Sequence, residues 1–76
     1  MICANVFQDT GDEYNTKLGF LSFPVLPPIG ATLNLTINGH ETYFKVIDIE
    51  YCAKLYERIH ELAIPVDIDI IVKEDI

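Results

Sequence analysis

The chain has 76 residues, half of them hydrophobic, and a formal net charge of −7. This length predicts one domain over residues 1–76, and the apolar content excludes an intrinsically disordered chain. No stretch approaches the ~18 consecutive apolar residues of a membrane span, and the five scattered basic residues argue against direct binding to nucleic acid or membranes.

The first half of the chain predicts two strands that are joined by a polar loop. Residues 2–7 form a short apolar run, residues 9–16 are polar, and residues 17–25 form a second apolar run. Pro24 lies in that second run and cannot donate a ladder hydrogen bond. We therefore expect the second strand to be an edge strand or to end early.

The middle of the chain predicts a β-hairpin over residues 31–51. Apolar and polar residues alternate over 32–38, and Asn38-Gly39 is typical of a tight turn between antiparallel strands. Residues 41–51 are rich in β-branched and aromatic side chains. The alternation slips at Val46-Ile47, which predicts a β-bulge.

The last third of the chain changes period. Apolar residues over 53–63 recur at helical spacing and end before Pro65, which predicts a short helix, with an irregular hairpin as the alternative. Residues 66–72 alternate again and predict a final strand. The expected fold is mainly β with one short helix (α+β), a five-stranded antiparallel sheet that forms a small barrel or is strongly bent. The lack of βαβ alternation argues against parallel strands.

Three segments carry a family resemblance: Pro27-Pro28-Ile29-Gly30, the strand from Tyr43 to Ile49, and the strand from Val66 to Val72. Together they resemble small SH3-like barrel proteins of phages and bacterial mobile elements. The resemblance covers residues 27–72 and implies an SH3-like barrel and a phage origin. It implies no cofactor and no catalytic motif.

Cys3 and Cys52 both have apolar neighbours, which favours the interpretation that they are small, buried hydrophobic side chains. The sequence does not decide whether the two cysteines form a disulfide. The N-terminus lacks the features of a secretory signal, so we expect a cytoplasmic protein with reduced thiols. Neither cysteine joins His40 or His60 at the close spacing of a metal site, and we expect no metal and no cofactor. No nucleophile and base stand within reach of each other, so the chain is predicted not to be an enzyme.

Paired carboxylates and exposed aromatic residues are the candidate binding groups. Carboxylates two positions apart on a strand share a face, so four of them gather if their two strands are neighbours. Tyrosine beside carboxylates favours protein recognition. Solvated strand faces and tyrosines that pad a barrel wall are the alternatives. The predicted partner-binding residues are Asp48, Glu50, Asp67, Asp69, Tyr14, Tyr43 and Tyr51.

These features predict a small acidic interaction protein that binds a protein partner, and the surplus of apolar residues predicts a homo-oligomer. The resemblance implies a phage-encoded inhibitor of a host protein, such as an anti-CRISPR-type inhibitor of a basic, nucleic-acid-binding defence nuclease. The alternative function is a structural or assembly subunit of a virion that forms homo-oligomers. A small enzyme or ligand-binding barrel is a third hypothesis.

Overall fold

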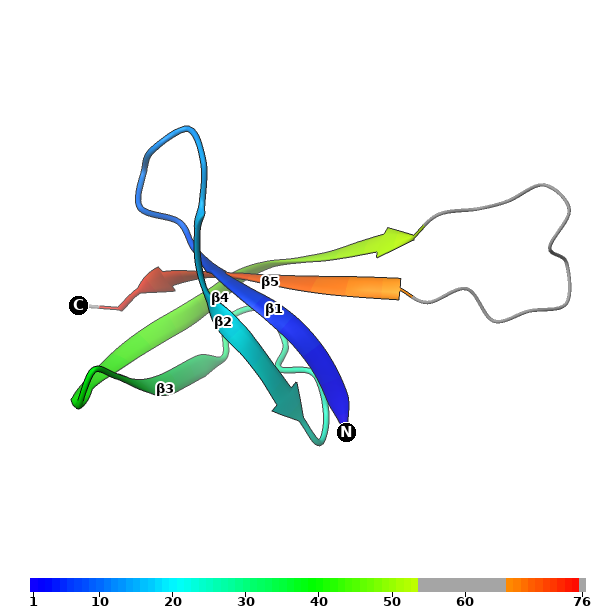
Figure 1. Ribbon diagram of the computed structural model, residues 1–76, viewed down its shortest axis with the longest axis horizontal. Helices are drawn as coiled ribbons and strands as arrows, with labels where there is room; N and C mark the ends of the chain where they lie inside the picture. The colour runs from blue at the N-terminus through cyan, green and yellow to red at the C-terminus, as the bar shows by residue number, and fades with distance from the viewer. Residues whose placement is uncertain (54–65, 76) are drawn as a thin grey trace, which may run out of the picture.

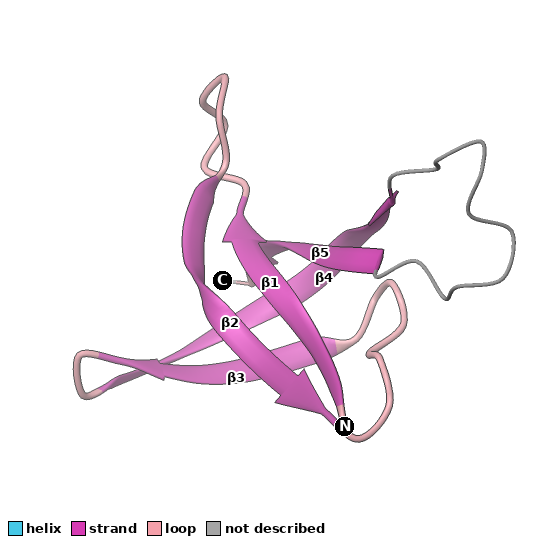
Figure 2. Ribbon diagram, turned by 45° about the vertical axis from the view of Figure 1, so that its right-hand side comes forward, coloured by secondary structure: helices cyan, strands magenta, loops and turns pink. Residues whose placement is uncertain are grey.

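The computed structural model describes residues 1–53 and 66–75. These residues form five strands and no helix: β1 (Ile2–Gln8), β2 (Thr16–Phe23), β3 (Thr32–Ile37), β4 (His40–Ala53) and β5 (Val66–Glu74). All five belong to one sheet in the order β2-β1-β5-β4-β3 (Figure 1). The sheet curls into a half-barrel whose two free edges are β2 and β3 (Figure 2). The predicted mainly β, five-stranded fold is confirmed.

The helix predicted over residues 53–63 lies outside the described residues, apart from Ala53, which is the last residue of β4. Over residues 1–53 and 66–75 no helix has the length and hydropathy that crossing a bilayer requires.

The expectation of an all-antiparallel sheet is wrong at one ladder. Strand β1 pairs with β5 in parallel, from Asn5↔Asp69 to Gln8↔Val72, whereas the other three ladders are antiparallel. A tight turn forces two strands to run antiparallel, but β1 and β5 stand at opposite ends of the sequence and no such turn joins them. The sheet is therefore mixed.

The local turn and edge predictions are confirmed. Asn38 and Gly39 both have positive φ angles, 52° and 80°, which a two-residue hairpin turn requires, and they join β3 to β4. Strand β2 ends at Phe23, directly before Pro24, and it is also an edge strand. Proline therefore ends the strand at a position where no neighbour needs its missing N–H group.

The predicted β-bulge is present in β4. The register with β5 runs from Val46↔Val72 to Asp48↔Ile71, so Ile47 is the extra residue. Because side chains alternate along a strand, one extra residue reverses the phase of everything that follows. Phe44 and Val46 point into the concave face, and Asp48 points to the convex face beyond the bulge.

The hydrophobic core fills the concave face of the half-barrel. Its buried members are Ala4, Val6, Phe44, Val46, Ile70 and Val72. Half-buried residues from β2, β3, β4, β5 and the β2–β3 connection pack around them, namely Leu18, Leu21, Phe23, Leu26, Ala31, Leu33, Leu35, Ile49 and Ile68. Ile71 is only 8% exposed but stands outside this cluster, on the convex face opposite Phe7 of β1.

Candidate functional site

The four predicted carboxylates lie together on the convex face. We call Asp48, Glu50, Asp67 and Asp69 the acidic cluster. Strands β4 and β5 are neighbours, and their ladder places Glu50 directly opposite Asp69 and Cys52 directly opposite Asp67. Alternation beyond the bulge keeps Asp48 on this face too. The condition for four carboxylates to gather, that their strands be neighbours, is therefore met.

Asp69 is the centre of the cluster because it receives contacts from both neighbouring strands. The Asn5 Nδ2 group donates a hydrogen bond to Asp69 Oδ1 at 3.0 Å from β1. The Cys52 thiol on β4 donates to Asp69 Oδ2 at 3.9 Å. These two contacts hold the Asp69 carboxylate between β1 and β4.

A row of side chains crosses four strands through Asp69. The register aligns Phe20 of β2 with Asn5 of β1, Asn5 with Asp69, and Asp69 with Glu50 of β4. Residues that are directly opposite each other share a face, so this row lies on the convex side. Phe20 is 62% exposed, which places an aromatic ring at one end of the row and two carboxylates at the other.

The β4–β5 ladder pairs like charges with like charges. Glu50 opposes Asp69 at the acidic end, and Lys45 opposes Lys73 at the other end. No residue that faces a member of the acidic cluster across a described ladder is Lys or Arg. Like charges in directly opposite positions destabilise a sheet. The convex face therefore has separate negative and positive ends.

The thiol of Cys52 responds to this negative charge. Its pKa is raised above the ordinary value of 9.0 by desolvation, by the negative charges of Asp69, Glu50 and Asp67, and by the hydrogen bond to Asp69. Each of these carboxylates disfavours a second negative charge on the sulfur. Cys52 is therefore held as a protonated thiol at neutral pH.

Glu50, Cys52 and Asp69 have the geometry to hold a cation. One ligand atom from each of the three lies within 4.8 Å of the others. The set mixes a thiol with two carboxylates, and the raised pKa of the Cys52 thiol disfavours the thiolate form that binds metal. It also has one ligand fewer than the four of a structural zinc site.

The prediction that the cysteines are buried is wrong. Cys3 and Cys52 are both exposed free thiols, because both point to the convex face, and the Cys3 Sγ lies 3.3 Å from the Ser22 hydroxyl. Strand β5 lies between β1 and β4, so the two cysteines are separated by two strand spacings, or about 9.6 Å. A disulfide requires Cα atoms within about 7 Å, so this arrangement does not let them pair.

The three predicted tyrosines are exposed but lie apart from one another. Tyr14 is in the β1–β2 loop, Tyr43 lies opposite Asn34 on the other side of the bulge, and Tyr51 lies opposite Ile68. The register places Tyr51 on the concave side, away from the acidic cluster. The structure therefore brings the four carboxylates together and does not join the tyrosines to them.

Sequence reasoning missed three residues that share the face of the cluster: Asn5, Phe20 and Cys52. The signal for Cys52 was its spacing of two residues from Glu50. Asn5 and Phe20 reach the cluster through the pairing of β1 with β5, and no local pattern encodes that pairing.

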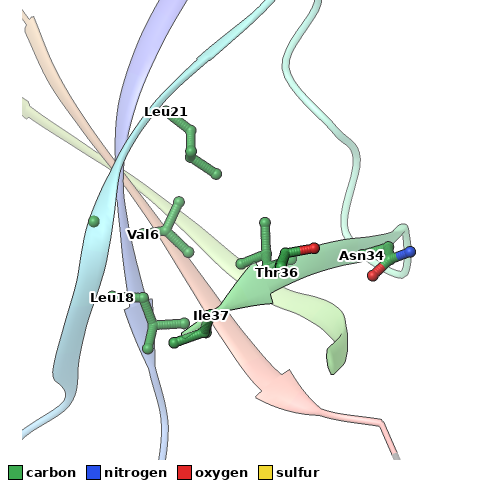
Figure 3. A pocket seen from close by; sticks show the side chains of 8 residues that line it. Val6, Leu18, Leu21, Asn34, Thr36 and Ile37 are labelled. Carbon is green, nitrogen blue, oxygen red and sulfur yellow. The ribbon is translucent and has the colours of Figure 1, made fainter. Parts of the chain in front are cut away.

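The described residues also form two depressions. An apolar groove of about 240 Å³ lies between the free edges (Figure 3). Its apolar lining includes Leu18 and Leu21 of β2, Val6 of β1, and Leu35 and Ile37 of β3. No Cα atom of β2 comes within 8 Å of a Cα atom of β3. A more polar, open depression of about 370 Å³ lies where the β1–β2 loop meets Lys73 and Glu74.

The chain was compared with protein-family models, with curated proteins and with solved structures. None of the three comparisons finds a match.

Proposed function

We propose that this chain is a non-enzymatic interaction protein whose acidic cluster binds a surface rich in Lys and Arg on a protein partner. In its most concrete form, the chain is a phage-encoded inhibitor that acts in the host cytoplasm. It occupies the basic nucleic-acid groove of a defence nuclease, as an anti-CRISPR-type inhibitor would. The observation that carries the proposal is the direct opposition of Glu50 and Asp69 on the convex face.

The opposition of two carboxylates favours a cationic ligand. The pair costs the folded chain stability, and a Lys or Arg placed between the two carboxylates converts that repulsion into two attractions. The hydrogen bonds from Asn5 and Cys52 fix Asp69 in place beforehand, so a ligand finds an oriented acceptor.

The neighbouring residues fit a protein partner better than a small ion. The row from Phe20 to Glu50 spans four strands and combines an exposed ring with carboxylates. Aromatic and charged groups together are typical of protein recognition surfaces. Electrostatic complementarity accelerates such binding and makes it sensitive to salt.

The experiment reverses charge at the cluster and at a matched site. Asp67→Lys/Asp69→Lys and the control Asp12→Lys/Glu13→Lys each change the net charge by the same amount, and the control pair lies in the exposed β1–β2 loop. The probe is a fluorescent, lysine- and arginine-rich peptide, with binding followed by anisotropy at low salt. We expect the cluster variant to lose about 30-fold or more in affinity and the control only a few-fold, since close charge pairs contribute ~1.5 kcal/mol or more each.

Thermal melts show whether both variants fold. We expect the cluster variant to melt at least as high as the unmodified chain, because the lysine introduced by Asp69→Lys then faces Glu50 as an opposite charge. Equal loss of binding in the two variants would mean that net charge alone attracts the peptide, and the proposal would be wrong. Capture from host extract with the same three baits then identifies the partner: it binds the unmodified chain and the loop control, but not the cluster variant.

A structural or assembly subunit is the second candidate function. It is favoured by exposed apolar side chains away from the acidic cluster, such as Val25 and Ile29 in the β2–β3 connection. A subunit of this kind forms homo-oligomers without a foreign partner. Light scattering after size exclusion tests it, because a strict monomer at micromolar concentration excludes an assembly subunit.

A further inference from the structure

Within residues 1–53 and 66–75, the free edge of β3 has none of the devices that usually prevent strands from pairing between molecules. Natural edge strands are protected by charged residues, proline, bulges or a covering segment. Strand β2, the other free edge, carries Lys17, a bulge in its ladder with β1, and Pro24 directly after its end. Strand β3 is six residues long and contains no charged residue and no proline, and its ladder with β4 is regular.

The sequence of β3 is self-complementary. Residues 32–36 read Thr-Leu-Asn-Leu-Thr, which is the same in both directions. If two copies pair antiparallel about a two-fold axis at Asn34, Asn34 meets Asn34 and each leucine meets a leucine. Each threonine likewise meets a threonine, and Ile37 meets Ala31. Every apolar residue then faces an apolar residue on the concave side.

The backbone of β3 supports the same register. Ile37 and His40 flank the two-residue turn and therefore form a hydrogen-bonded pair within the hairpin. Alternation along the antiparallel ladder then directs the N–H and C=O groups of Thr32, Asn34 and Thr36 to the free edge. In the register centred on Asn34 these three residues meet their equivalents in the second copy, so all of their outward groups pair.

The charges next to β3 are complementary in this arrangement. On the convex face Lys45 lies opposite Thr32 and Glu41 lies opposite Thr36, at the two ends of β3. Antiparallel pairing of Thr32 with Thr36 of a second copy places Lys45 of one copy in line with Glu41 of the other. This occurs twice, once on each side of the axis. The uncharged strand thus lets two copies of net charge −7 meet where their nearest charges attract.

We propose that two copies of this chain associate through β3, antiparallel and centred on Asn34, to form a continuous ten-stranded sheet. The two halves meet by the same surface, as in an isologous dimer. The acidic clusters lie on β4 and β5, one strand or more from the interface, and stay accessible in the dimer. The dimer is independent of the proposed function, because no residue of the acidic cluster takes part in it.

Disulfide trapping tests both the interface and its register. The variants Asn34→Cys and Thr36→Cys are made in a Cys3→Ser/Cys52→Ser chain and incubated with oxidised glutathione. Opposite residues of a hydrogen-bonded antiparallel pair have Cα atoms about 5.5 Å apart, within disulfide range. In the proposed register the two Thr36 positions are about 13 Å apart, four residues along the strand, and cannot pair.

We expect Asn34→Cys to form a covalent dimer at least ten times faster than Thr36→Cys at equal protein concentration. Light scattering of the unmodified chain should also show a dimer that dissociates on dilution. Thermal melts of both cysteine variants establish that each is folded, and both replaced side chains are exposed. Equal cross-linking rates at positions 34 and 36, or an unmodified chain that stays monomeric up to millimolar concentration, would overturn the proposal.

Discussion

Two opposite kinds of surface lie in one small sheet: the acidic cluster on the β4–β5 ladder and the free edge of β3. At the acidic cluster the backbone groups that β4 and β5 turn toward each other pair in their ladder, and the side chains carry unbalanced charge. At β3 the side chains are uncharged, and the backbone has an open edge. The first surface is defined by its charged side chains, and the second by an open backbone edge without charge.

Together the two proposals assign to this chain of 76 residues two recognition modes on separate surfaces. Charged side chains on a paired ladder favour a foreign partner of opposite charge and fast association. An uncharged open edge favours a strand with the same pattern, and the hydrogen bonds there are indifferent to net charge. Each of the following changes is expected to alter the behaviour of one surface and to leave that of the other unchanged.

The largest effect is expected from Asn34→Pro. Proline removes the N–H group that points to the free edge and leaves the bonds from β3 to β4 intact. Two backbone hydrogen bonds at the centre of the dimer are lost and the ring blocks close approach, so the dimer dissociation constant should rise about 30-fold or more. Asn34→Ala is the matched control, because it shortens the side chain and keeps the N–H group.

Sedimentation equilibrium measures this change, and peptide anisotropy measures the other surface in the same samples. The affinity for the basic peptide should stay within about twofold in both variants. If Asn34→Ala dissociates the dimer as fully as Asn34→Pro, side chains and not the backbone edge hold the two copies together.

Salt separates the two surfaces without a mutation. Raising the salt concentration from about 50 to 500 mM shortens the screening length from roughly 14 to 4 Å, and binding of the basic peptide should weaken by about tenfold or more. The dimer should hold or tighten slightly, because screening also relieves the repulsion between two copies of charge −7. A dimer that weakens as steeply as peptide binding would indicate that charge pairs, and not the strand edge, dominate self-association.

The smallest effect is expected at the acidic cluster, where the reactivity of the Cys52 thiol reports the local charge. Glu50→Gln removes one of the negative charges that raise the pKa of the Cys52 thiol, so that pKa falls and more thiolate is present at pH 8. In a Cys3→Ser chain the reaction of Cys52 with a thiol reagent should accelerate about two- to fourfold. This is the effect on thiol ionisation expected from one unit charge a few ångströms away in water. Glu41→Gln, on the hairpin end of β4, should leave the rate unchanged.

Local sequence patterns predicted the parts of the fold that local chemistry determines. Asn38-Gly39 specified the turn, the break in alternation at Val46-Ile47 located the bulge, and Pro24 marked the end of β2. The pairing of β1 with β5 was missed because its direction and register depend on contacts between residues 64 positions apart, such as Asn5 and Asp69.

The candidate site was predicted to the same extent. Spacing of two along a strand placed each pair of carboxylates on one face, and the antiparallel ladder of β4 with β5 brought the two pairs together. The burial of Cys52 was predicted from its neighbours Tyr51 and Ala53, which do point to the concave side. The phase of the strand beyond the bulge, and not the polarity of adjacent residues, decides which face each side chain takes.

The bulge at Ile47 therefore has a meaning for how such a surface can arise. If Ile47 were instead paired as an ordinary ladder residue, the alternation that buries Phe44 and Val46 would also carry Asp48, Glu50 and Cys52 into the core, and Ile49 would face solvent. The bulge leaves Ile47 without a partner, so the strand accommodates one additional residue and still buries Ile49 and displays its acids. A single unpaired backbone position thus decides whether the same side chains form a charged surface or disrupt the core.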